Sequence, residues 1–198
     1  MAENKKIKNA LISVYHKDGL EDILQILNRE GVHFISTGGT QTFIEGLGYE
    51  CQAVESLTTY PSILGGRVKT LHPRIFGGIL ARRDDKGDQT QMKEYEIPEI
   101  DLVIVDLYPF AETVKNGGTE QEIIEKIDIG GISLIRAAAK NFNDVAIIAS
   151  KAEYEPFKAL LHEQGAELTR EQRRWLAERA FGVTQSYDTD IHNWFERT

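Results

Sequence analysis

The sequence predicts an α/β protein with three layers, α/β/α, in which a mainly parallel sheet lies between helices and a helical C-terminal extension follows. Short apolar runs alternate with amphipathic segments, as in a parallel sheet whose connections are helices. The runs ALISV, LVIV and VAIIA are apolar throughout, which is typical of strands buried on both faces. Beyond about Ala149 these runs cease and only helical patterns remain. We therefore expect one domain, with its core over residues 1–150 and a helical extension over 151–198.

Each predicted strand is an apolar run bounded by polar or turn-forming residues. The clear strands are Asn9–Val14, His33–Ser36, Leu102–Asp106 and Val145–Ala149, and a weaker one lies near Cys51–Val54. Helix starts are indicated by a capping residue followed at the third position by Glu or Gln, a spacing that satisfies two backbone donors. The pairs are Asp18 with Glu21, Thr119 with Glu122, Ser150 with Glu153, and Thr169 with Gln172.

The extension is predicted to contain two helices, Glu171–Phe181 and Thr184–Phe195. Two interpretations of its large apolar side chains are open. The helices pack on the sheet, or they present an apolar face for dimerisation or for docking of a further domain. These side chains are Trp175, Leu176, Phe181, Tyr187, Ile191, Trp194 and Phe195.

The formal net charge of -8 disfavours a nucleic-acid partner, because the phosphate backbone repels an acidic chain. Cys51 is the single cysteine, so no disulfide forms within the chain. The charged start MAENKKIKN has no apolar signal region, and the longest apolar runs are far too short to span a bilayer. Composition therefore predicts a cytoplasmic protein without a membrane partner.

A hydroxyl and a lysine lie at the end of the first predicted strand, in the segment Ser13–Lys17. Ligands of open α/β sheets bind at the carboxyl ends of strands, so Ser13 and Lys17 are candidates to bind an anion. The alternative is a polar strand end with a solvated lysine, which is how most loop lysines occur.

A second segment joins a strand to a helix and is made only of glycine and hydroxyl residues. Glycines let the backbone approach a ligand closely, hydroxyls donate, and a helix N-terminus favours negative charge. We favour a phosphate site here over a tight turn with Thr40 as the helix N-cap. The segment consists of Ser36, Thr37, Gly38, Gly39 and Thr40.

The third segment, GGRVKTLHP, presents Arg67, Lys69 and Thr70 together in a glycine-flanked loop. It resembles a nucleotide-binding P-loop only superficially, because that motif needs glycine directly before the lysine and Val68 stands there. A site for a nucleoside triphosphate is therefore disfavoured. His72 is a candidate catalytic group or, before Pro73, an equally good structural histidine.

The fourth segment combines acid–base groups with glycines. We expect Asp128 and Lys140 to pair and to hold a proton in a partly desolvated pocket. The other candidates bind ligand atoms at a strand end or through backbone amides that precede a helix. They are Asp106 and Tyr108 at the strand end, and Gly130 and Gly131 before the helix.

A metal site is the less favoured interpretation of Asp188, Asp190 and His192, which lie close together in the extension. Asp188 and His192 share one helix face, but HExxH is absent and no second ligand cluster occurs in the sequence. We expect a solvated face and no metal.

The motifs ALISV-HK, STGGT, GGRVKTLHP, LYPF, IDIGG and RAAAKN follow in this order from about Lys8 to Tyr154, and RRWLAERAF comes after them. Together they resemble the IMP cyclohydrolase domain of the bifunctional purine-synthesis enzyme that also carries AICAR transformylase. GGRVKTLHP with IDIGG is the specific part, since related methylglyoxal synthase-like domains also bind phosphate at STGGT. The resemblance implies a methylglyoxal synthase-like fold, ring closure of 5-formamidoimidazole-4-carboxamide ribonucleotide to IMP and water, no cofactor, and a homodimer.

For that reaction the candidate residues form two groups. Lys69 is the candidate for stabilising the oxyanion, and Tyr108, Asp128 and Lys140 are candidates for moving protons. The second group binds the substrate and its phosphate. It consists of Ser13, Lys17, Ser36, Thr37, Gly38, Gly39, Thr40, Arg67, Thr70, Asp106, Ile129, Gly130 and Gly131.

Three features depart from the family pattern. Tyr15 stands where an SVSDK-like segment has serine, so its phenol replaces or removes one phosphate contact. Asp106 stands where NLYPF is common, which adds negative charge in place of an amide donor. The sequence has no large transformylase domain, so we expect that partner to be separate or missing.

Two rival functions use the same fold. A non-catalytic module that binds a phosphorylated effector needs STGGT and a cation, but not the second set of polar groups in GGRVKTLHP and IDIGG with Lys140. A methylglyoxal synthase-type lyase acts on a three-carbon substrate, which leaves much of this set unused. Ring closure of the ribonucleotide is the function that uses all of these polar groups.

Overall fold

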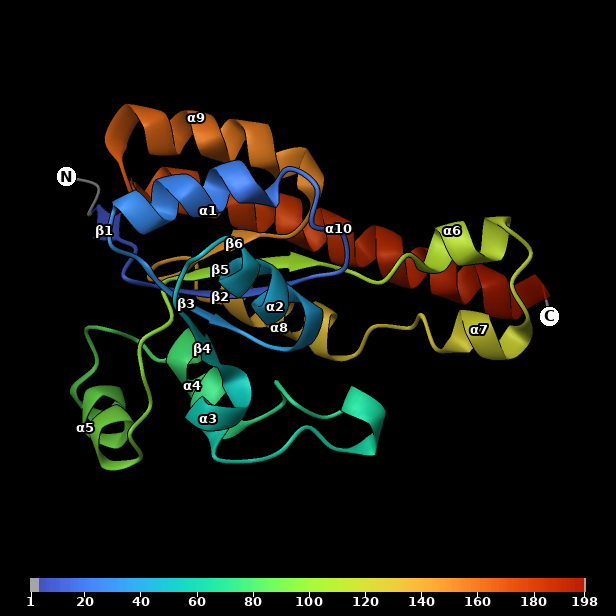
Figure 1. Ribbon diagram of the computed structural model, residues 1–198, viewed down its shortest axis with the longest axis horizontal. Coiled ribbons are helices and arrows are strands. Elements are labelled where there is room, and N and C mark those ends of the chain that lie inside the picture. Colours follow the sequence, from blue (N-terminus) through green and yellow to red (C-terminus); the bar gives the residue numbers. More distant parts are fainter. Residues whose placement is uncertain (1–3, 198) are drawn as a thin grey trace.

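The centre of the molecule is a five-stranded parallel sheet with the strand order β4-β3-β2-β5-β6 (Figure 1). This computed structural model describes residues 4–197. Three strands have the predicted bounds, and the other two are slightly shorter than predicted. They are β2 (Asn9–Val14), β3 (His33–Ser36), β5 (Leu102–Asp106), β4 (Cys51–Ala53) and β6 (Ala146–Ile148).

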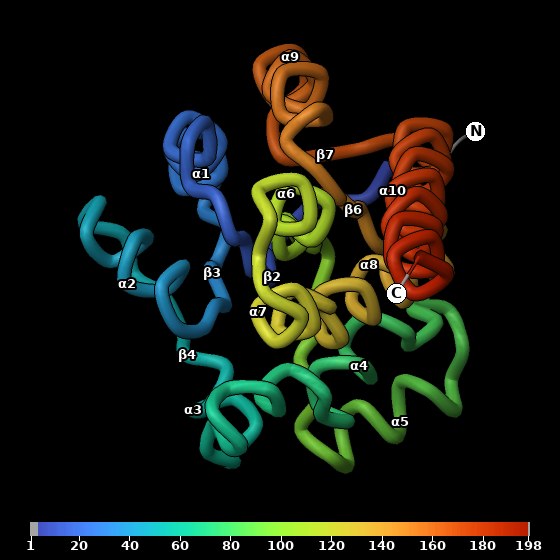
Figure 2. Tube along the Cα trace, turned by 90° about the vertical axis from the view of Figure 1, so that its right-hand side faces the viewer, coloured from blue at the N-terminus to red at the C-terminus, as the bar shows by residue number. Residues whose placement is uncertain are grey.

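Helices cover both faces of this sheet, which confirms the three-layer α/β/α prediction. Seen from the carboxyl ends of the strands, α1 and α9 lie over one face and α8 with α4 over the other (Figure 2). Within residues 4–197 no helix combines the length and apolarity needed to cross a bilayer. The helices are α1 (Leu20–Arg29), α2 (Gly38–Gly46), α3 (Val54–Thr58), α4 (Pro73–Leu80), α5 (Lys86–Glu94), α6 (Phe110–Lys115), α7 (Glu120–Ile124), α8 (Gly130–Lys140), α9 (Tyr154–Gln164) and α10 (Arg170–Arg197), with the 3-10 turns η1 (Leu64–Gly66) and η2 (Lys151–Glu153).

Burial explains why the strands are apolar without alternation. Val103 and Ile104 are neighbours in β5, so their side chains point to opposite faces, and both are 0% exposed. Each face of the strand therefore meets a helical layer, as expected for a parallel sheet.

The order in which the chain adds strands to the sheet reverses between β2 and β5. From β2 the chain moves to β3 on one side, whereas β5 pairs with the other side of β2, with Val14 opposite Asp106. Ligands of such sheets bind outside the carboxyl ends of the strands at this switch point. In Figure 1 these ends point towards α6, α7 and the C-terminal end of α10.

The prediction that strands cease beyond Ala149 is wrong. A short strand β7 (Glu167–Leu168) pairs antiparallel with β1 (Lys5–Lys6) in a separate two-stranded sheet. Two-residue strands are too short to show an alternating pattern, so the sequence gives no signal for them.

The extension also contains a single long helix, α10, where two were predicted. Gly182 lowers the helix propensity between the predicted pair, but a glycine within a helix costs only about 1 kcal/mol. Helix α10 packs on α8, β6 and α6, and Thr184, which follows Gly182, is 2% exposed, so tertiary contacts hold the helix on both sides of this residue. The apolar residues partly serve that packing: Leu176 is 1% exposed, whereas Phe195 is 55% exposed.

Two of the predicted helix caps are confirmed in full. Thr119 and Glu122 exchange reciprocal bonds, as do Thr169 and Gln172. The prediction at Asp18 is wrong, because the left-handed Gly19 forms the N-cap of α1 and the Asp18 carboxylate pairs with a lysine of η2. At Ser150 the hydroxyl accepts from the amide of Ala152, so this cap starts η2.

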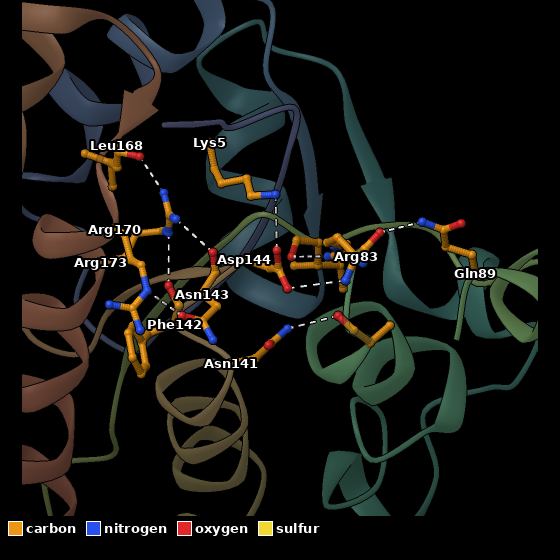
Figure 3. Close-up of polar contacts among 12 residues, drawn as sticks. Lys5, Arg83, Gln89, Asn141, Phe142, Asn143, Asp144, Leu168, Arg170 and Arg173 are labelled. Carbon is orange, nitrogen blue, oxygen red and sulfur yellow. Dashed lines mark hydrogen bonds and ion pairs between the residues drawn. The ribbon is translucent and has the colours of Figure 1, made fainter. Parts of the chain in front are cut away.

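A polar network ties the C-terminal end of α8 to the amino edge of the sheet (Figure 3). The Asn141 side chain donates to the carbonyl oxygens of Ile79 and Ala81, at 2.8 and 3.0 Å. The guanidinium of Arg173 is 2% exposed and donates to the carbonyl oxygens of Phe142 and Asn143, at 3.0 and 2.8 Å. The Asn141 bonds attach the end of α8 to the end of α4, and the Arg173 bonds satisfy carbonyls of the turn that leads into β6.

Candidate functional site

The predicted polar segments meet at the carboxyl ends of β2 and β5. The amide of Tyr15 donates to the carbonyl oxygen of Asp106 at 3.3 Å, so the pairing continues past the last residue of β2. The segments that follow the two strands, Ser13–Lys17 and Asp106 to Tyr108, therefore lie side by side at the switch point of the sheet.

Two ammonium groups flank the first turn of α2. A β-carbon built on Gly39 lies 3.8 Å from Lys17 Nζ, and one built on Gly38 lies 3.7 Å from Lys69 Nζ. Gly38 also has a φ of +55°, a left-handed conformation that favours glycine. The two ammonium groups and the backbone amides at the N-terminus of α2 thus surround the Gly38–Gly39 turn. This arrangement favours the binding of an anion.

The Lys17 ammonium is partly committed to the strand end. It donates to the carbonyl oxygens of Val14 and Tyr15 at 3.0 and 2.8 Å. Burial lowers its pKa, against the raising effect of the Asp106 carboxylate. An ammonium has three donors, so one remains for a ligand beside Gly39.

The hydroxyl groups of the STGGT segment bind the protein itself. Ser36 is fully buried and donates to the carbonyl oxygen of Ile12 at 2.7 Å. Thr40 donates to the carbonyl oxygen of Val14 at 3.0 Å, and Thr37 donates to Glu55 at 2.7 Å. In this structure each of these hydroxyls therefore donates within the protein, because buried hydroxyls take the nearest backbone or carboxylate acceptor. Their expected bonds to a phosphate stay a prediction.

The alternative role of Thr40 is not supported. The N-cap of α2 is Thr37, and Thr40 lies within the helix, where its hydroxyl also accepts from the amide of Val14 at 3.2 Å. The two lysines and the backbone amides are the other groups of this turn that are placed to bind an anion. Ser13 is half-buried in β2 beside them.

Asp128 provides a carboxylate next to this turn. Its Oδ1 accepts from the amide of Gly131 at 2.7 Å, and its Oδ2 accepts from the amide of Tyr108 at 3.4 Å. Burial nevertheless raises the pKa of Asp128, and the Asp106 charge adds to this, while both amides and the Lys69 charge oppose it. A buried carboxyl with such a pKa is suited to accepting and returning a proton.

Two glycines let the start of α8 approach its neighbours. A β-carbon on Gly131 would lie 2.7 Å from Asp128 Oδ2, which no side chain tolerates without a shift. A β-carbon on Gly130 would lie 3.1 Å from the hydroxyl oxygen of Thr70. Thr70, which is 5% exposed, thus brings the GGRVKTLHP segment against the IDIGG segment.

Tyr108 lies at the rim of the site, next to an aromatic ring and an ammonium group. Its ring meets that of Tyr15 edge to face, with centroids 5.6 Å apart. The Lys126 ammonium lies 5.1 Å from the Tyr15 centroid and 5.7 Å from the Tyr108 centroid. Burial raises the pKa of Tyr108, and the charge of Asp128 and the neighbouring Tyr15 raise it further. The phenol therefore keeps its proton and is a donor.

Asp106 binds a residue that the sequence reasoning missed. Its Oδ2 accepts from the backbone amide of His16 at 2.8 Å and lies 2.8 Å from His16 Nδ1. The carboxylate that was expected to contact substrate thus orients an imidazole at the same strand end. The signal was present, since His16 directly precedes Lys17.

Lys140 does not join the other catalytic candidates. It is exposed and ends α8, whereas Asp128 precedes the first residue of that helix. Eleven residues of α-helix extend over about 16 Å, which a lysine side chain does not bridge. The predicted pairing of Asp128 with Lys140 is wrong, because the turn after Lys140 is held at the amino edge of the sheet (Figure 3).

Other predicted residues lie at the rim or outside the site. The Arg67 side chain is 67% exposed and pairs with Glu125, and Ile129 is 59% exposed. His72 is the N-cap of α4, where its Nδ1 accepts from the amide of Arg74 at 3.2 Å. His72 therefore has a structural contact of the kind expected before Pro73.

Among residues 4–197, no three His, Cys, Asp or Glu side chains gather as metal ligands. His192 Nε2 instead lies 3.5 Å from a carboxylate oxygen of Glu196. Two surface hollows, of about 510 and 340 Å³, are lined by residues around Arg74 and around Trp194. Neither contains Lys17, Lys69 or Asp128, so the candidate site is defined by converging charges rather than by the depth of a cavity.

Comparison with protein families gives two matches along the chain. Residues 19–133 match the family described as "MGS-like domain". Residues 138–198 match the family described as "AICARFT/IMPCHase bienzyme". The first match covers the glycine turn, Lys69 and Asp128 and begins just after Lys17, and the second covers the C-terminal end of α8 together with α9 and α10.

Similar proteins include two named "Bifunctional purine biosynthesis protein PurH". The one from Bacteroides thetaiotaomicron is 65% identical over 99% of this chain and 39% of its own length. The one from Corynebacterium glutamicum is 47% identical over 97% of this chain and 36% of its own length. The chain thus spans less than half of these relatives. The solved structure "Crystal structure of ForH" has a TM-score of 0.80 at 34% identity, covering 96% of this chain and 97% of that one.

Proposed function

We propose, from the premise that this chain belongs to the family of MGS-like domains, that it is an IMP cyclohydrolase of purine biosynthesis. The observation that carries the proposal is the convergence of Lys17 and Lys69 on the Gly38–Gly39 turn, beside the buried Asp128 carboxyl. The match to the bienzyme family over residues 138–198 and the identity with PurH proteins support the choice of reaction.

The reaction is an intramolecular condensation of 5-formamidoimidazole-4-carboxamide ribonucleotide. The carboxamide nitrogen forms a bond to the formyl carbon, and the formyl oxygen becomes the oxyanion of a tetrahedral species. That oxygen leaves as water with one proton from the carboxamide nitrogen and one from the formamido nitrogen, which gives IMP. The site must hold the reacting conformer, stabilise the oxyanion and move these two protons.

The candidate residues divide these tasks. The phosphate of the ribonucleotide binds at the first turn of α2, with Lys17 and the amides after Thr37. Lys69 and the phenol of Tyr108 donate to the formyl oxygen, and the Asp128 carboxylate accepts the proton from the attacking nitrogen. This assignment uses the raised pKa of Asp128, which makes it a stronger base than an ordinary aspartate.

We further propose that the chain acts as a cytoplasmic homodimer and that a transformylase accompanies it. The relatives' length beyond the matched region, the word "bifunctional" in their name and the match to the AICARFT/IMPCHase bienzyme family support the second part. Sedimentation of the purified chain tests the first. The assay with a folate formyl donor should give no turnover with this chain alone.

The purified chain should convert the formamido ribonucleotide to IMP without added metal or nucleotide. The reaction transfers no electrons and needs no external nucleophile, so protein groups suffice. The measurement is the absorbance change on ring closure, with and without a chelator. Activity that disappears with chelator and returns with a divalent ion would contradict the proposal. Turnover of a triose phosphate, or tight binding of a phosphorylated ligand without turnover, would favour the lyase or the effector module.

Lys17→Met should raise KM by about tenfold or more and change kcat much less. The ammonium is proposed to hold a phosphate remote from the reacting atoms, and loss of such uniform binding appears mainly in KM. Methionine keeps an unbranched stem, so packing beside Gly39 changes little. Steady-state kinetics give both constants. A large fall in kcat at unchanged KM would instead assign Lys17 to the chemical step.

A further inference from the structure

We propose that Tyr187 is a positioning residue that fixes the Asp128 carboxylate, so that α10 forms part of the framework of the active site. This inference rests on the proposed cyclohydrolase. It concerns a side chain on the C-terminal helix, 59 residues beyond Asp128 in sequence.

The Tyr187 hydroxyl clamps the loop that joins α7 to α8. It accepts from the backbone amide of Asp128 at 2.9 Å and donates to the carbonyl oxygen of Lys126 at 2.5 Å. A phenol has a single proton to donate, and this one goes to the loop. Both ends of the segment from Lys126 to Asp128 are therefore attached to a side chain of α10.

The clamped segment carries two of the charged groups at the site. The Asp128 carboxylate reaches the amides of Gly131 and Tyr108, at 2.7 and 3.4 Å, only while its backbone stays in place. The Lys126 ammonium lies over the rings of Tyr108 and Tyr15. A shift of this loop would move a carboxylate and an ammonium together, and a displacement of about 1 Å costs on the order of 100-fold in rate.

Tyr187 is itself held in place. Its ring packs edge to face on the Phe110 ring, with centroids 6.2 Å apart. Trp194 also packs on the Phe110 ring, with centroids 6.1 Å apart. Phe110 is 1% exposed and comes two residues after Tyr108, so α10 also anchors the segment that carries this phenol.

The hydroxyl also keeps its proton under working conditions. Burial raises the pKa of Tyr187 to about 12, and the charges of Asp128 and Asp188 raise it as well, against the lowering effect of the bond to the Asp128 amide. The donor to the Lys126 carbonyl is therefore present throughout the neutral range.

The test is Tyr187→Phe, which removes the hydroxyl and keeps the ring on Phe110. We expect kcat to fall by about 10- to 100-fold, with KM changed only a few-fold and the fold retained by circular dichroism. In an Asp128→Asn background the same change should cause no further loss, since the clamp acts through that carboxylate. The matched control is Tyr49→Phe, a half-buried tyrosine against Phe34 outside the site, which should leave kcat unchanged.

Normal kcat in Tyr187→Phe, or losses that multiply in the double variant, would overturn the proposal. The titration of the Asp128 carboxyl, followed by carbon-13 NMR in wild type and Tyr187→Phe, gives a readout independent of turnover. We expect the two midpoints to differ, and identical midpoints also overturn the proposal. If wild type fails to close the ring, the proposed function is wrong, while this titration still decides the role of Tyr187.

Discussion

Lys69→Met should lower kcat by about 100- to 1,000-fold, which is the usual cost of removing one preorganised donor to an oxyanion. The Lys69 ammonium lies near the Gly38 turn, and its charge acts on Asp128, so it is within range of both the bound ligand and the proton acceptor. Negative charge reaches the formyl oxygen only in the tetrahedral species, which is why kcat rather than KM carries the effect. Steady-state kinetics give kcat and KM, and the IMP affinity measured by calorimetry shows whether binding is retained.

The matched control for this variant is Lys93→Met, which removes an exposed ammonium from the last turn of α5. It should keep kcat and KM near the wild-type values. If Lys69→Met behaves in the same way, Lys69 is a solvated residue, and positioning together with backbone amides must account for catalysis.

Asp128→Asn should lower kcat by about 100- to 10,000-fold, because the amide keeps the shape of the carboxylate but cannot accept the proton. The side-chain oxygen can still accept from the Gly131 amide, so the start of α8 should remain ordered. IMP affinity measured by calorimetry checks that binding survives. A variant that keeps more than about a tenth of the wild-type kcat would exclude Asp128 as the proton acceptor.

The pH dependence of kcat provides a second test of Asp128. The ionised form is the active one, so kcat should fall as pH decreases through the pKa of this group. Because burial raises that pKa, the fall should occur at a higher pH than for an ordinary aspartate. Asp128→Asn should abolish this acid limb. Lys69→Met should move it to still higher pH, since the lysine charge lowers the Asp128 pKa in the wild type.

The sheet was predictable because its strands are buried on both faces. Such strands consist of continuous apolar runs, and the bounds of Asn9–Val14 and Leu102–Asp106 follow from them. The two strands of the small sheet have no comparable signal, since Lys5–Lys6 and Glu167–Leu168 are only two residues long and pair across more than 160 positions of sequence. The continuity of α10 across Gly182 was likewise unpredictable, because it depends on packing against α8 and β6.

Charged groups of the site were easier to predict than its hydrogen bonds. Lys17 follows a strand, Lys69 lies in a glycine-flanked loop, and Asp128 precedes two glycines, all of which are local patterns. No pattern shows that the hydroxyls of Ser36 and Thr40 bind strand carbonyls, because sequence does not give the direction of a side chain.

Contacts between distant segments were the least predictable part. The bond between Tyr187 and the Asp128 amide joins residues 59 positions apart, and a lone tyrosine on a helix gives no indication of such a partner. The predicted pairing of Lys140 with Asp128 is wrong for a related reason. The two residues are close in sequence, but the length of α8 separates them in space.

The pairing of β1 with β7 also constrains the order in which the chain folds. It joins Lys5 to Leu168, whereas all strands of the central sheet have been synthesised by Ile148. Because loop closure between such distant residues costs entropy before it gains contacts, the ribbon forms late. A chain emerging from the ribosome can therefore assemble its central sheet while α10 is still missing. Residue 187 follows later still, so the two bonds from its hydroxyl to the Lys126–Asp128 segment form only after the strands of the central sheet have been synthesised.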